Sequence, residues 1–95
     1  MQVEFDSEVW YWHGPAPYYF VTVPAKACDT LKDISGLVTY GWGMIPATIR
    51  MGNTSWKTSL FPKNGGYIVP LKASVRMAEK IEEGDIVSLT LQVGI

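Results

Sequence analysis

The sequence has few of the residues that build metal sites, disulfides or phosphate-binding surfaces. Its 95 residues include one cysteine and one histidine, and its eight lysines and arginines are outnumbered by nine aspartates and glutamates. One cysteine cannot form an internal disulfide, and with one histidine it falls short of the three or four ligands of a zinc site. A formal charge of -1 argues against DNA binding through phosphate contacts, which needs a basic surplus. We therefore expect no cofactor and no DNA partner.

Long apolar runs are also missing. No stretch approaches the ~20 apolar residues of a membrane span, and no basic segment followed by an apolar run opens the chain. The sequence therefore predicts a cytoplasmic protein without a membrane partner. With 47% hydrophobic residues, it has the composition of one domain over residues 1–95.

What the sequence does contain is an internal repeat. Residues 19–27 and 65–73 each hold an apolar run, a proline and a Lys-Ala pair, and a helical pattern follows each copy. The two prolines, Pro24 and Pro70, are 46 positions apart. Two copies are too few for a solenoid. The repeat therefore favours one pseudo-twofold domain with halves at about residues 1–51 and 52–95.

Apolar spacing and glycine positions predict two short helices within a mainly β chain. The helices are expected from Ala25 to Ser35 and from Lys72 to Ile81, each ended by a glycine, Gly36 or Gly84. Such short helices suit a small barrel better than a parallel sheet that they would have to cover. The apolar stripes that should be buried are Cys28, Leu31 and Ile34 in the first helix and Leu71, Val75, Ala78 and Ile81 in the second. The expected strands cover residues 3–12, 18–23, 37–42, 47–51, 55–61, 67–69 and 86–93.

Three segments of the second half carry a family resemblance. Residues 49–62, residues 66–72, and residues 75–79 with the Gly84-Asp85 pair resemble a family of uncharacterised small bacterial proteins. The resemblance implies a single-chain relative of the AbrB/MazE-type double-split β-barrel, which two chains of about half this length build together. We therefore expect a pseudo-twofold double-split β-barrel with two inserted helices. The resemblance brings no established activity.

Four cations in the second half are candidates for binding an anion. Lys72 in the first turn of the second helix and Arg76 four residues later should share one helix face. The strand and turn before that helix should bring Lys57 and Lys63 nearby. The alternative is solvated surface charge, with Arg76 paired to a nearby acid.

Aromatic residues are more numerous than alternating strands can turn inward. Trp10, Tyr11 and Trp12 are consecutive, so at least one ring must point away from the core. Such a ring is consistent with a groove for a planar ligand, with Trp12 and Trp56 as candidate binding rings, or with a dimer contact. Core packing with a single exposed ring is the alternative. The aromatic set comprises Trp10, Tyr11, Trp12, Tyr18, Tyr19, Trp42 and Trp56.

No nucleophile, base and orienting group can be assembled from the sequence, so no catalytic residue is assigned. His13 precedes a Gly-Pro pair and is expected in an exposed loop, and Cys28 is expected in the core. We therefore expect a non-enzymatic binding or interaction module for a small ligand, an anion or a protein, as a monomer or weak homodimer. A nucleic-acid-binding regulator or antitoxin-like module, by analogy of fold, is the first alternative, and an enzyme with an unrecognised site is the second.

Overall fold

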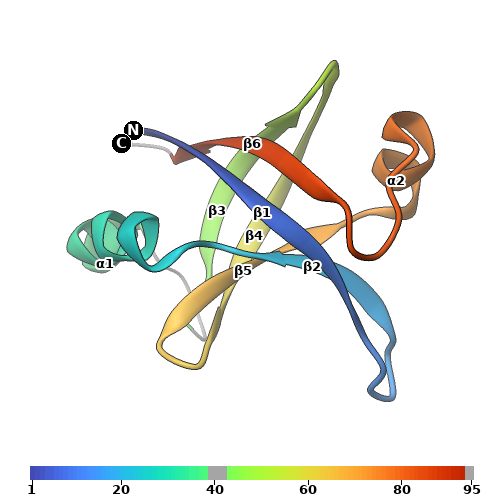
Figure 1. The fold of residues 1–95 in the computed structure, drawn as a ribbon. Coiled ribbons are helices and arrows are strands. Elements are labelled where there is room, and N and C mark those ends of the chain that lie inside the picture. Colours follow the sequence, from blue (N-terminus) through green and yellow to red (C-terminus); the bar gives the residue numbers. More distant parts are fainter. Residues whose placement is uncertain (39–42, 94–95) are drawn as a thin grey trace.

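The computed structural model describes the backbone of residues 1–38 and 43–93, with the side chains of residues 1–33 and 43–93. Six antiparallel strands close into a barrel, and two helices lie on opposite sides of it (Figure 1). The expected small β-barrel with two short helices is therefore confirmed. The strands are β1 (Gln2–Trp12), β2 (Tyr18–Thr22), β3 (Ile45–Met51), β4 (Thr54–Lys63), β5 (Gly66–Leu71) and β6 (Ile86–Val93), and the helices are α1 (Ala25–Val38) and α2 (Ala73–Glu79).

Strand pairing follows the internal repeat. The order around the barrel is β1-β2-β5-β4-β3-β6. Exchanging β1, β2 and β3 for β4, β5 and β6 leaves every pairing unchanged. The long strand β1 pairs first with β6 and, from Val9, with β2, while β4 pairs first with β3 and, from Phe61, with β5. Thr22 and Ile68, which are repeat mates, face each other in the β2–β5 ladder. The chain is thus pseudo-twofold in its topology.

One apolar core fills the barrel and extends beneath the helices. Every buried residue among those that the structure describes is hydrophobic. α1 adds Cys28 and Leu31 to this core, α2 adds Val75, and Ile81 follows from the segment after α2. These four residues were expected to be buried, and the structure confirms them. None of the helices in the described part of the chain is long and apolar enough to cross a membrane.

α1 begins at Ala25 as expected, but its predicted end at Ser35 is wrong. The helix passes through Gly36 and ends at Val38. A glycine inside a helix costs only about 1 kcal/mol relative to alanine, and no proline follows to stop the helix. Leu37 and Val38, expected to begin a strand, therefore form the last helical turn. The rest of that expected strand, with Trp42, and the side chain of Ile34 lie outside what the structure describes.

α2 is shorter than the predicted segment from Lys72 to Ile81. Lys72 lies just before the helix in an extended conformation, with φ -63° and ψ 150°. Lys80 lies just after it in the left-handed region, with φ 54°. Ala78 was expected on the buried face but is exposed, because a helix this short turns only Val75 into the core.

The end of α2 is a Schellman motif rather than a glycine cap. The Lys80 N–H donates to the Met77 carbonyl at 3.4 Å, and the Ile81 N–H donates to the Arg76 carbonyl at 2.9 Å. Gly84, predicted as the cap, lies instead in the turn before β6 with φ 92°. Local backbone hydrogen bonds therefore end the helix without glycine.

Candidate ligand-binding groove

The β1–β2 hairpin sorts its aromatic residues onto two faces. Val9 pairs with Val21 in the core, so the next pair along that face is Tyr11 with Tyr19. The residues between them, among them Trp10, point to the other face because side chains alternate along a strand. The outer face therefore holds two cross-strand aromatic pairs, Trp10 with Phe20 and Trp12 with Tyr18.

Phe20 is the centre of the outer aromatic cluster. Its ring centroid lies 5.2 Å from that of Trp10, 5.6 Å from that of Tyr18 and 6.4 Å from that of Phe61 on β4. Phe20 itself is buried, whereas Trp12, Tyr18 and Phe61 are 42%, 36% and 37% exposed. The exposed rings around the buried Phe20 ring therefore form an apolar patch on the surface of the protein.

Two adjoining hollows lie over this cluster. The larger, of about 460 Å³, is lined mainly by residues of the hairpin and β4, with Pro70 and Lys72 from the end of β5. The smaller, of about 210 Å³, lies beside Trp10 and Lys63. They share Trp12, Phe20 and Phe61. We call the two hollows together the aromatic groove; its lining residues are Trp10, Trp12, Ala16, Pro17, Tyr18, Phe20, Thr58, Phe61, Pro62, Lys63, Ile68, Pro70 and Lys72.

The charge of the aromatic groove is of one sign. Among the residues that the structure describes, two lysines line it, and neither an aspartate nor a glutamate does. Lys63 Nζ lies 5.9 Å from the centroid of the Trp10 ring, so the ammonium group sits beside the aromatic surface. An apolar surface with cations and no acids favours a ligand that combines a flat apolar body with an anionic group.

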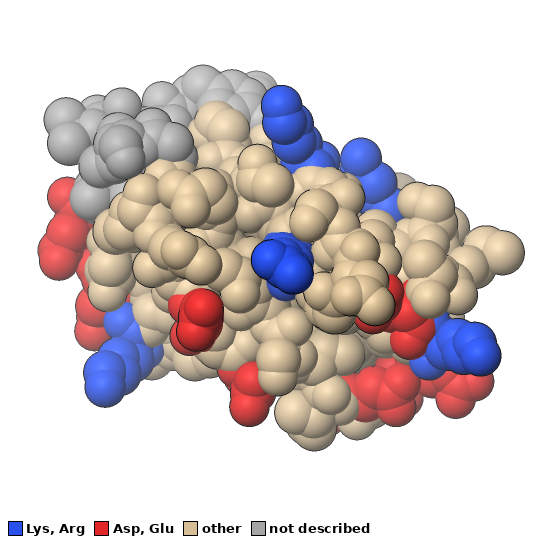
Figure 2. All heavy atoms as spheres, turned by 90° about the horizontal axis from the view of Figure 1, so that it is seen from above, with Lys and Arg blue, Asp and Glu red and all other residues tan. Residues whose placement is uncertain are grey.

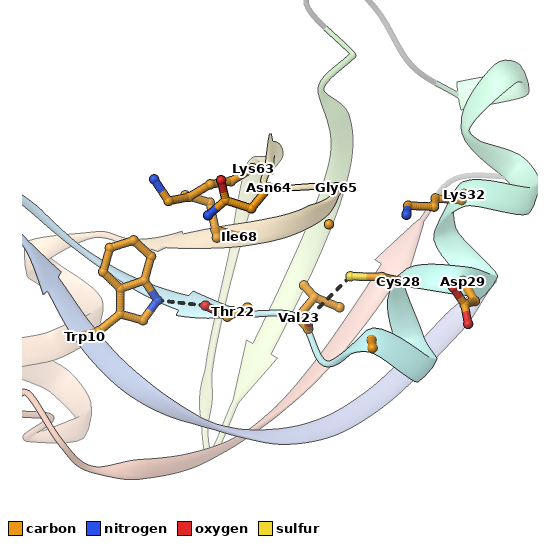
Figure 3. Close-up of a pocket in the computed structure, with 12 residues that line it drawn as sticks. Trp10, Thr22, Val23, Cys28, Asp29, Lys32, Lys63, Asn64, Gly65 and Ile68 are labelled. Atoms are coloured by element: carbon orange, nitrogen blue, oxygen red, sulfur yellow. Dashed lines mark hydrogen bonds between the residues drawn. The ribbon is translucent and has the colours of Figure 1, made fainter.

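A third hollow, of about 320 Å³, lies between the β4–β5 turn and the first turns of α1 (Figure 3). The Trp10 indole N–H donates to the Thr22 hydroxyl at 2.9 Å at one side of it, and the Cys28 thiol donates to the Val23 carbonyl at 3.2 Å at the other. Asn64 and Lys63 come from the turn. The hollow meets the aromatic groove at three shared residues, Trp10, Lys63 and Ile68.

The inner face of the hairpin is held against α2. The Arg76 guanidinium lies 3.8 Å from the centroid of the Tyr19 ring. The ring centroids of Tyr19 and Tyr11 are 4.7 Å apart, and those of Tyr11 and His13 are also 4.7 Å apart, in an edge contact. Arg76 Nε is buried and has no hydrogen-bond partner among the residues that the structure describes. Stacking on Tyr19 therefore helps to hold this guanidinium.

The structure separates the candidate residues that the sequence grouped. Lys63, Lys72 and Trp12 line the aromatic groove. Lys57 lies in another hollow, between β3 and β4, with Thr48 and Gln92. The four cations therefore do not gather around one anion site. Lys72 and Arg76 also do not share a helix face, because Lys72 precedes α2.

Trp56 is a core residue rather than a ligand-binding ring. It is 8% exposed, and its indole N–H is buried with no hydrogen-bond partner in the described part of the chain. Trp56 and Phe61 are five positions apart on β4, so alternation turns their side chains to opposite faces. Sequence reasoning named Trp56 and missed Phe61. The odd spacing of the two residues could have identified Phe61. On one strand, residues at odd spacing point to opposite faces, so burial of Trp56 exposes Phe61.

A family described as "Domain of unknown function (DUF1905)" matches residues 5–91 of the chain. No curated protein matches it.

Proposed function

The chain belongs to the family described as domain of unknown function DUF1905, and we propose that it is a non-enzymatic binding module. Its ligand has a flat apolar part and an anionic group such as a carboxylate, sulfonate or phosphate. One observation carries the proposal: among the residues that the structure describes, the aromatic groove has three exposed rings and two lysines but no acidic residue. The rings hold the apolar part, and Lys72 pairs with the anion at the open end.

The proposed binding mode assigns different roles to the rings and to Lys72. Burial of a flat ligand against Trp12 and Phe61 supplies affinity roughly in proportion to the apolar area removed from water. Lys72 adds a charge-assisted hydrogen bond, which fixes the orientation of the ligand and selects for an anion. Removing the Trp12 ring should therefore weaken the binding of every flat ligand, whereas removing the Lys72 charge should weaken the binding of anionic ligands only.

Two dyes that differ by one sulfonate group test this division. Anilinonaphthalene sulfonate is flat and anionic, and anilinonaphthalene is the same body without charge. We predict that Lys72→Gln weakens binding of the sulfonate about fivefold to tenfold, as expected for the loss of one charge-assisted contact. Binding of the uncharged dye should change less than twofold. Trp12→Ala should weaken both dyes, and fluorescence titration gives all the dissociation constants.

Lys57→Gln is the matched control, because Lys57 is also an exposed lysine but lies outside the aromatic groove. It should leave the affinity for both dyes unchanged. Equal loss of affinity in Lys57→Gln and Lys72→Gln would mean that the dye responds to net charge alone. Failure of the wild-type protein to bind either dye would also contradict the proposed function.

The same charges disfavour the nucleic-acid alternative. A protein that binds nucleic acid through phosphates gathers its cations into a basic stripe or patch. In Figure 2, lysines and arginines are interspersed with acids on the face in view. The alternative of an enzyme is disfavoured for want of a nucleophile, a base and an orienting group that work together, and we propose that the protein needs no cofactor.

We also propose descent from an AbrB/MazE-type barrel and a bacterial setting, both of which rest on the family resemblance, and a cytoplasmic setting, which rests on the sequence composition. Exchange symmetry of the strand pairing supports the descent, because fusing two copies of a half-barrel leaves one chain with two equivalent halves. In this view the aromatic hairpin is where the halves diverged. The loop of residues 13–17 lengthens the β1–β2 hairpin, whereas Asn64 and Gly65 alone connect β4 to β5.

A further inference from the structure

We infer that the aromatic groove continues past Trp10 into the hollow beside α1, and that the extended site binds an acidic, aromatic peptide segment of a partner protein. This inference rests on the proposed function and names the partner of the same site. It starts from the residues that the hollows share. Trp12, Phe20 and Phe61 join the two parts of the groove, and Trp10, Lys63 and Ile68 join the groove to the third hollow.

The two ends of the extended site differ in chemistry. The end at Lys72 is lined by rings and prolines. The end at α1 is lined by polar groups, among them the Thr22 hydroxyl and the Asn64 amide, and by one charge of each sign, Asp29 and Lys32. A small flat ligand fills the first end only. A peptide chain uses both, because its side chains suit the rings while its backbone amides suit the hydroxyl and amide groups.

The lysines set the charge pattern of the peptide. Lys72 lies at the ring-lined end and Lys63 lies where the groove meets the polar hollow. In the part of the chain that the structure describes, no carboxylate oxygen lies within ion-pair distance of either lysine. The complementary segment therefore carries one acidic residue near each lysine and at least one aromatic or large apolar residue between them.

Single-stranded nucleic acid is the competing occupant, since it also combines flat rings with anions. The lining disfavours it for two reasons. Its phosphates repeat at every unit, whereas the extended site offers three lysines, Lys32, Lys63 and Lys72. The rings of Trp10, Tyr18 and Phe20 are also tilted against one another, which leaves few open faces for base stacking.

Selection from a random peptide library displayed on phage tests the inference. Peptides retained by the intact protein should be enriched in aspartate or glutamate on both sides of an aromatic residue. One enriched peptide, synthesised with a fluorescent label, should bind Lys63→Gln and Lys72→Gln each about fivefold to tenfold more weakly than wild type, as measured by fluorescence anisotropy. Lys57→Gln should bind it as wild type does.

Three results would overturn the inference. They are a selection without acidic enrichment, a selected peptide that binds Lys63→Gln and Lys72→Gln as well as it binds wild type, and displacement of the peptide by oligothymidylate at lower concentration than by unlabelled peptide. The dye titration separates this failure from that of the proposed function. If the sulfonate dye still requires Lys72, the groove is a small-ligand site and only the peptide partner is wrong.

Discussion

Arg76 illustrates at the residue scale how a distant contact changes the role of a side chain. In sequence it is one of four cations grouped as an anion site, or a partner for a nearby acid. In the structure its guanidinium stacks on Tyr19, which is 57 positions earlier in the chain. The stack lies on the inner face of the hairpin whose outer face supplies Trp12 and Tyr18 to the groove. Arg76 therefore packs against the face of the hairpin that is opposite to the aromatic groove.

A double-mutant cycle tests the Arg76–Tyr19 stack. We expect Arg76→Met and Tyr19→Leu to be coupled by about 1–2 kcal/mol in the free energy of unfolding, because a partly buried cation–π contact has this strength. Chemical denaturation of wild type, both single variants and the double variant gives the coupling. Effects that add to within about 0.4 kcal/mol would mean that the two side chains do not stabilise each other.

At the scale of elements, the C-terminus of α2 depends on a lysine with an unusual backbone conformation. Lys80 has φ 54°, a conformation that costs a non-glycine residue about 1 kcal/mol. We predict that Lys80→Gly stabilises the protein by up to about 1 kcal/mol, since glycine adopts this conformation without strain. Thermal unfolding measures the change.

Met77→Gly is the control and should destabilise the protein, because Met77 is exposed within α2 and glycine there lowers the helix propensity. A lower midpoint for Lys80→Gly would contradict the assigned helix end.

Element by element, apolar spacing predicted more of the fold than glycine did. The period of Cys28 and Leu31 located α1, and alternation located the strands, because burial imposes those periods directly. Gly36 and Gly84 gave wrong helix ends, since a glycine permits a helix to end without forcing it. The strand expected over residues 55–61 continues through Pro62 to Lys63, because beyond Leu60 β4 pairs with β5 alone.

The candidate site was less predictable than the core. The alternation of residues along the chain indicated an exposed aromatic face. It did not indicate which rings are in contact, because the groove is formed by residues of β1, β2, β4 and β5. Lys72 and Trp12 share a hollow only through the barrel order, in which β2 lies between β1 and β5. Trp56 was predicted to bind a ligand because of its residue type, but its side chain is buried in the core.

At the scale of the whole molecule, closure of the barrel limits how a partner binds. At the aromatic groove, β2 is paired with β1 on one side and with β5 on the other, so a peptide cannot join the sheet there as an added strand. The recognition that we propose for the groove therefore uses side chains on a face. The aromatic groove carries two positive charges, whereas the whole chain has a formal charge of -1, so the remainder is negative. This contrast draws an anionic ligand to the groove and away from the rest of the surface.

The most direct test of the groove is to follow the tryptophan indole N–H resonances by NMR while anilinonaphthalene sulfonate is added. Trp12 lines the groove and is 42% exposed, whereas Trp56 is buried in the core. We predict that the Trp12 resonance, assigned with Trp12→Phe, moves with the same midpoint as the dye fluorescence while the Trp56 resonance stays in place. A Trp12 resonance that does not move while the dye binds would place the site elsewhere and contradict the account.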